Sequence, residues 1–196
     1  SLDGFVVVTT PQDLAKLVVR RSFFLARETR RLMLAKRIIR RHVPTEPTTL
    51  VISTVSRRTL RDGAEFPSFF FGNLAEELGD LGIRVTPLAL ILREVPFKAA
   101  LQGLRGGLRP VMVLNRYLNF FDLVYVAVAT IRPPPVPRPL PDFVGMDIAP
   151  LLNEDLRVHW VSNRAAEAML LVALARRLSR LTSSITRIIY VYENQP

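Results

Sequence analysis

The sequence contains no cysteine and only two histidines, His42 and His159. Without cysteine the chain can form no disulfide framework, no cysteine-ligated metal site and no thiol nucleophile. Two histidines leave little for a histidine metal site or a serine–histidine triad. The glycine-rich phosphate loops and the common hydrolase motifs are also absent. We therefore expect neither a metal nor a cofactor.

The sequence also lacks an uninterrupted apolar run long enough to cross a bilayer. The two longest candidates, 111–131 and 165–181, contain charged residues such as Arg116 and Glu167, which are costly at a bilayer centre. The first residues carry too little positive charge for a signal peptide. These observations favour a cytoplasmic protein.

The residues that are present describe a globular, basic protein. The chain has 196 residues, of which 49% are hydrophobic and 22% charged, enough for one domain with a sizeable core. Its net charge is +10. Residues 11–41 hold ten Lys and Arg against two acidic residues, a net charge of +8, which leaves +2 for the rest. The charge therefore belongs to one segment.

Hydrophobic periodicity predicts alternating strands and helices. The expected strands are 5–9, 50–55, 83–92 and 185–192. The expected helices are 11–41, 73–81, 97–104, 111–130, 147–158 and 162–181. A strand, a loop, a helix and a strand in this order are typical of a right-handed parallel unit. We therefore predict an α/β fold, a three-layer Rossmann-like domain with a mostly parallel sheet, preceded by a basic amphipathic helix.

The expected domain division falls in a linker that contains Pro44 and Pro47, which cannot continue a helix. Residues 1–47 would form an N-terminal strand, the basic helix and the linker, and residues 48–196 the Rossmann-like domain. Residues 132–141 include six prolines, which predict a stiff connector. Because the chain stops directly after a strand, we expect this domain to be truncated at its C-terminal end.

A loop rich in charge follows the strand at 50–55, at the edge where open parallel sheets bind ligands. Its candidate anion contacts are Arg57, Arg58 and Arg61, whose guanidinium groups suit phosphate or carboxylate. Asp62 and Glu65 are candidate general bases. The alternative is a solvated turn without function.

Polar side chains also follow the last strand. Glu193, Asn194 and Gln195 are candidates for binding sugar hydroxyls, because they come at the carboxyl end of a buried strand. The alternative is that Asn194, Gln195 and Pro196 only turn the chain.

Four stretches together resemble the bacterial surface-carbohydrate biosynthesis proteins. They are Leu50-Val-Ile-Ser-Thr-Val-Ser56, Glu65-Phe-Pro-Ser-Phe-Phe-Phe-Gly72-Asn-Leu74, Asp147-Ile-Ala-Pro-Leu-Leu152 and Ile188-Ile-Tyr-Val-Tyr-Glu-Asn-Gln-Pro196. Glu77-Leu78 and Gly82, which follow the second stretch, also belong to the resemblance. The resemblance covers roughly residues 30–196, and its most specific piece is the terminal Tyr-Glu-Asn-Gln-Pro. The chain departs from the family at Phe69-Phe70-Phe71, where a polar–aromatic pair is usual.

The resemblance implies a glycosyltransferase with two Rossmann-like domains, the B-type architecture, of which this chain is the N-terminal half. That half would bind a glycan or lipid-linked acceptor. The family continues with Trp-Glu and a helix, and the second half that follows would bind the nucleotide-sugar donor. In such a transfer a carboxylate deprotonates the acceptor hydroxyl while basic groups stabilise the departing phosphate. We assign Glu65 as the base with Asp62 in reserve.

A shorter stretch, Leu2 to Ser22, resembles a strand and helix of the Mrp/MinD-type ATPases. It lacks the Gly-Lys loop and the Asp-bearing switch that bind nucleotide in those proteins. An ATPase fragment is therefore the third hypothesis, and no ATPase activity is carried over.

The basic helix allows three interpretations. Its arginines could contact anionic lipid headgroups, which would make the protein peripheral on the inner face of the plasma membrane. They could bind nucleic acid, although the aromatic residues needed for base stacking are few. They could also form a solvated face. The residues assigned to the membrane surface are Arg20, Arg27, Arg30, Arg31, Arg37 and Arg40. A non-catalytic binding module built on this helix is the alternative to the transferase.

Overall fold

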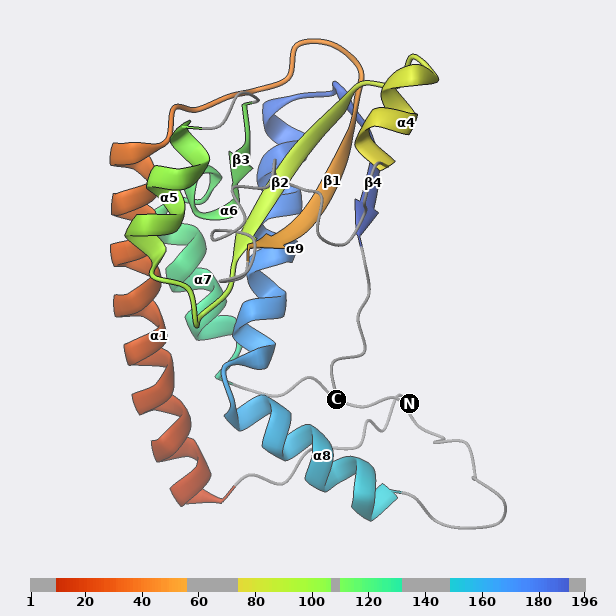
Figure 1. Cartoon of the computed structure of the whole chain (residues 1–196). Coiled ribbons are helices and arrows are strands. Elements are labelled where there is room, and N and C mark those ends of the chain that lie inside the picture. The colour runs from red at the N-terminus through yellow and green to blue at the C-terminus, as the bar shows by residue number, and fades with distance from the viewer. Residues whose placement is uncertain (1–9, 56–73, 107–109, 132–148, 191–196) are drawn as a thin grey trace. The chain divides into compact units, whose positions relative to one another are not determined.

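The computed structural model describes residues 10–55, 74–106, 110–131 and 149–190 (Figure 1). The predicted strand at 5–9 and the proline-rich connector at 132–141 lie outside these residues. The chain forms two compact units. The first comprises Ser1–Thr29 and Phe120–Ala173, and the second Arg30–Asn119 and Leu174–Pro196. The predicted division into 1–47 and 48–196 stays a prediction.

The elements follow one another in α/β order. The helices are α1 (Pro11–Ile38), α4 (Leu74–Asp80), α5 (Phe97–Gly106), α6 (Leu114–Tyr117), α7 (Phe120–Ala129), α8 (Ala149–Val161) and α9 (Arg164–Leu181). The strands are β1 (Thr48–Val55), β2 (Val85–Ile91), β3 (Met112–Val113) and β4 (Ile185–Tyr190). In the described part of the chain, no helix combines the length and the hydropathy needed to cross a membrane.

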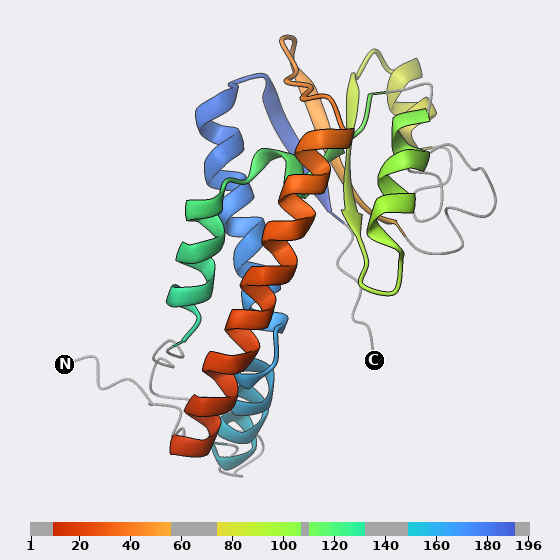
Figure 2. The same ribbon diagram turned by 90° about the vertical axis from the view of Figure 1, so that its left-hand side faces the viewer.

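The four strands form one parallel sheet in the second unit, in the order β3-β2-β1-β4. At its centre, Ile52 of β1 lies opposite Leu88 of β2 and Tyr190 of β4. Parallel neighbours need a crossover between them, and α4 and α5 supply those from β1 to β2 and from β2 to β3. Figure 2 shows α4 and α5 on one side of the sheet and the last turns of α9 on the other. The structure confirms the predicted α/β fold of Rossmann-like type with a parallel sheet.

The local signals at the helix ends explain where these elements begin and stop. Thr10 precedes α1, and its hydroxyl accepts a hydrogen bond from the Asp13 backbone N–H at 3.1 Å, while Asp13 Oδ2 accepts one from the Thr10 N–H at 3.3 Å. This reciprocal pair is a capping box. After α4, Gly82 has a φ of 71°, which favours glycine and lets the chain turn back into β2. Ser162 Oγ accepts from the Arg164 N–H at the start of α9.

Two predictions about these elements are wrong. The last strand, predicted to be buried, is β4, and it is exposed along most of its length because it lies at the edge of the sheet. Residues 111–130 do not form a single long helix: Met112 and Val113 form β3 and pair with Leu88 and Ala89 of β2. The helix α6 follows, and Leu118 ends it in an extended conformation with φ −75° and ψ 161°, before α7 begins. A continuous apolar run is compatible with a buried strand as well as with a buried helix. Here the first residues of the run form a strand because they pair with β2.

The core of the second unit joins the end of α1 to α5 and the sheet. Ala35 and Ile39 pack in one buried cluster with Ala89 of β2, Leu101 of α5 and Val113 of β3. β1 is buried along most of its length, as expected for a central strand covered on both faces. The end of the basic helix is therefore fixed against the sheet by its apolar side.

Candidate functional site

The carboxyl edge of the sheet contains a topological switch point between β1 and β4. Both strands run in the same direction and are hydrogen-bonded neighbours. The chain proceeds from β1 through β2 to β3 on one side, then returns to place β4 on the other side of β1. Open α/β sheets bind ligands outside the carboxyl ends of strands at such a point. β1 ends there at Val55 and β4 ends at Tyr190.

The predicted catalytic and substrate-binding residues follow these two strand ends in the sequence. Those that follow β1 are Arg57, Arg58, Arg61, Asp62 and Glu65, and those that follow β4 are Glu193, Asn194 and Gln195. All eight lie outside the described residues, and their roles stay predictions.

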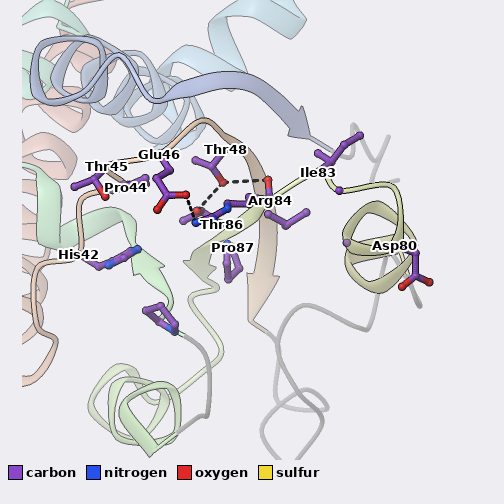
Figure 3. Close-up of a pocket in the computed structure, with 14 residues that line it drawn as sticks. His42, Pro44, Thr45, Glu46, Thr48, Asp80, Ile83, Arg84, Thr86 and Pro87 are labelled. Atoms are coloured by element: carbon purple, nitrogen blue, oxygen red, sulfur yellow. Dashed lines mark hydrogen bonds and ion pairs between the residues drawn. The ribbon is translucent and has the colours of Figure 1, made fainter.

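The amino edge of the sheet contains a hollow of about 760 Å³ (Figure 3). Thr48 Oγ1 donates to the Arg84 carbonyl at 3.1 Å and lies 2.9 Å from Thr86 Oγ1. Because Thr48 has one hydroxyl hydrogen, Thr86 is the donor in the second bond. Glu46 forms an ion pair with the Arg84 side chain. These contacts join the starts of β1 and β2, whereas Asp80 points away from them.

A second hollow, of about 1000 Å³, continues from the first, because His42 and Pro110 line both. The last turn of α1 and the residues after it, the end of α5 and Arg116 of α6 form its walls. Its cationic residues are Lys36, Arg37, Arg40, Arg41, Arg105 and Arg116. No carboxylate is present among the residues that line this hollow in the described part of the chain. We call this second hollow the basic pocket.

The backbone that forms one wall of the basic pocket is held by side chains. Arg116 Nε donates to the carbonyl of Ile39 at 3.0 Å. The Tyr117 hydroxyl accepts a bond from the backbone N–H of His42 at 3.2 Å and donates to the His42 carbonyl. Burial raises the pKa of Tyr117, so its hydroxyl stays protonated at neutral pH. Further along, Thr182 Oγ1 donates to the Pro44 carbonyl at 3.1 Å.

Most cations of the basic pocket have no partner among the residues that the structure describes. Arg116 has the Ile39 carbonyl as its partner. The other five side chains are exposed. Within the described residues, none of the five has a hydrogen-bond or ion-pair partner. Guanidinium forks match the oxygens of phosphate and carboxylate groups, so this arrangement suits an anion with several oxygens.

The six arginines predicted to face a membrane differ in their surroundings. In the first unit, Arg20 donates to the Val161 carbonyl at 3.1 Å, and Arg27 pairs with Glu28 at 2.8 Å and Glu167 at 3.0 Å. In the second unit, the Arg31 guanidinium lies 4.9 Å from the centre of the Phe97 ring. The remaining three are exposed: Arg30, Arg37 and Arg40. Membrane contact by this helix stays a prediction.

Comparisons with protein-family models, with curated proteins and with solved structures found no match to this chain. Function is therefore inferred from the sheet topology, the charged hollow and the sequence motifs. The dense positive charge at 36–41 can be read from the sequence, and Arg37 and Arg40 were predicted from it to be functional residues. Arg105 and Arg116 were missed because they belong to elements far apart in the sequence, which only folding brings to α1.

Proposed function

We propose that this chain is the acceptor-binding half of a glycosyltransferase that builds cell-surface polysaccharide from a nucleotide-activated sugar. The observation that supports it is the switch point between β1 and β4. The two groups of predicted site residues directly follow these neighbouring strands, where Rossmann-like sheets bind ligands. The sugar chemistry rests on the resemblance of the sequence motifs, because a fold alone does not specify a reaction.

In the proposed reaction Glu65 accepts the proton of an acceptor hydroxyl, with Asp62 in reserve. The acceptor oxygen forms a bond to the anomeric carbon of the donor sugar as the bond from that carbon to the phosphate oxygen breaks. The departing nucleoside diphosphate keeps the electron pair, and Arg57, Arg58 and Arg61 would offset its charge. Glu193 and Asn194 would orient the acceptor hydroxyls. With a lipid-linked acceptor, the reaction would take place at the inner face of the plasma membrane.

The test is transfer by the full-length natural protein and its Glu65→Gln variant. Release of nucleoside diphosphate would be followed with a panel of nucleotide sugars and a lipid-linked glycan extract. We expect Glu65→Gln to lower kcat by at least about 100-fold, the usual contribution of general base catalysis, while acceptor binding is retained. Asp155→Asn, which changes an exposed carboxylate of α8, is the control and should leave turnover unchanged.

Two results would contradict the proposal at different levels. Unchanged turnover in Glu65→Gln would remove the assignment of the base but leave the transferase. Release of no nucleoside diphosphate by the unaltered protein, with any donor of the panel, would reject the transferase itself.

A further inference from the structure

The basic pocket lies at the amino edge of the sheet, whereas the proposed transfer site lies at the carboxyl edge. Its residues take no part in the proposed reaction. Their charge therefore needs a separate account, which does not depend on the transferase proposal.

The negative ends of the helix dipoles do not balance so much positive charge. The C-terminal turns of α1 and α5 line the basic pocket, and each helix C-terminus carries about half a negative charge. Two such ends are offset by about one cation. Among the described residues the basic pocket has six cationic side chains, so a local excess of about five positive charges is left after the helix ends are neutralised.

Within the described residues, no carboxylate of the chain balances this excess positive charge. In the first unit, Arg27 is paired with two carboxylates, and at the neighbouring hollow Arg84 is paired with Glu46. Lys36, Arg37, Arg40, Arg41 and Arg105 have no such partner in the described chain. Clustered like charges repel one another and reduce stability unless a counter-ion binds.

The backbone that lines the basic pocket is also held in place by the protein itself, without a ligand. Arg116 and Tyr117 hold the backbone of Ile39 and His42 by three hydrogen bonds. Tyr117 is itself buried. Binding an anion therefore requires ordering of the charged side chains but not of the chain that bears them, and a preorganised backbone lowers the cost of binding.

We propose that the basic pocket binds a phosphate-bearing anion with more than one phosphate group, such as a free diphosphate or a phosphorylated lipid headgroup. A single phosphate would neutralise only part of the local charge. A hollow of about 1000 Å³ is at the upper end of small-ligand sites and has room for a larger polyanion. The adjoining hollow with Thr45, Glu46 and Asp80 provides space for an uncharged remainder of the ligand.

The first test is calorimetric titration of the chain with pyrophosphate at fixed ionic strength, in the unaltered protein and in Arg37→Gln/Arg41→Gln. Both side chains are exposed, so the variant should fold. The control, Arg180→Gln/Arg187→Gln, removes two exposed cations that do not line the basic pocket. We expect one site, weakened at least about tenfold for each lost charge-assisted pair in the first variant and changed less than about twofold in the control.

The second arm identifies the source of the phosphate. Vesicles of phosphatidylcholine with and without cardiolipin, a lipid with two phosphate groups, are sedimented with each protein. Binding of free pyrophosphate supports a soluble ligand. Binding only to vesicles with cardiolipin, lost in Arg37→Gln/Arg41→Gln and retained in the control, supports a lipid headgroup. Equal loss in both variants, or binding of RNA that pyrophosphate does not displace, would overturn the proposal.

An observation on the unaltered protein keeps the proposal testable if a variant fails to fold. Addition of pyrophosphate should shift the backbone amide resonances of residues 36–42, 104, 105, 111 and 116, which line the basic pocket. Shifts spread evenly over the other exposed arginines, or none at all, would show that no such site exists.

Discussion

Arg21 shows how a basic residue can serve the fold rather than a partner. It is only 2% exposed, although it belongs to the most basic segment of the chain. Its guanidinium donates to the carbonyls of Trp160 at 2.7 Å, Ser162 at 2.9 Å and Thr130 at 3.4 Å, and to Asn163 Oδ1 at 2.9 Å. The last carbonyls of α8 have no partner within the helix, and Arg21 supplies one.

We predict that Arg21→Met lowers the free energy of unfolding by about 2–4 kcal/mol, because three carbonyls and the Asn163 side chain lose a charged donor. Arg20→Met is the matched control. Arg20 is exposed and, among the described residues, makes one hydrogen bond, to the Val161 carbonyl, so its loss should cost less than about 1 kcal/mol. Urea unfolding of both variants measures the difference. Equal losses would contradict a special role for the buried guanidinium.

Among the elements, α1 has two structural roles, one in each of its halves. Its N-terminal part contributes Arg20, Arg21 and Arg27 to contacts within the first unit. Its C-terminal part packs Ala35, and Ile39 directly after it, into the core of the second unit and leaves Lys36 and Arg37 exposed. The amphipathic pattern is the same in both parts, and the difference lies in the acceptors that folding brings near each part.

The start of α1 gives a prediction about pH. Hydrogen bonding to Thr10 is the largest cause that holds the pKa of Asp13 below its usual value; burial opposes it, and the charge of Arg157 adds a smaller lowering effect. Arg157 Nη1 lies 3.0 Å from Asp13 Oδ2. A depressed folded pKa contributes stability that is complete above the unfolded pKa and is lost as the pH falls through the folded pKa.

Asp13→Asn should therefore be less stable than the unaltered protein at neutral pH, and the two should converge as the pH is lowered through the folded pKa of Asp13. Urea unfolding at a series of pH values measures this. Asp80→Asn, an exposed position on α4, should show no such convergence. A difference for Asp13→Asn that stays constant into acid would mean that the amide disturbs the capping box by its shape and not by its missing charge.

The elements also show what a sequence reveals. Long segments with clear periodicity and capping residues, such as α1 behind Thr10, could be predicted, and so could β1 and β2. β3 could not, because a two-residue strand leaves no periodic signal and depends on pairing with Leu88 and Ala89. Only part of the basic pocket could be predicted. The cations at the end of α1 are neighbours in the sequence, whereas Arg105 and Arg116 are brought to them by the tertiary fold.

At the scale of the whole molecule, the net charge of +10 has two parts with different expected behaviour. Cations scattered over the surface are screened by any salt. A preorganised cluster responds to the chemistry of the anion, because a ligand that binds only the folded state stabilises it by an amount that grows with the logarithm of its concentration relative to its Kd. A comparison of two anions at one ionic strength therefore separates general screening from a specific site.

We predict that pyrophosphate raises the Tm of the chain more than sodium chloride does at the same ionic strength. At about 100 times its Kd a ligand adds about 2.7 kcal/mol, which for a chain of this size corresponds to roughly 5–10 °C. Arg37→Gln/Arg41→Gln should lose this extra stabilisation, while Arg180→Gln/Arg187→Gln should keep it. Scanning calorimetry of the three proteins measures it. If pyrophosphate raises the Tm equally in all three, its effect is screening of the whole molecule, and the basic pocket has no specific part in it.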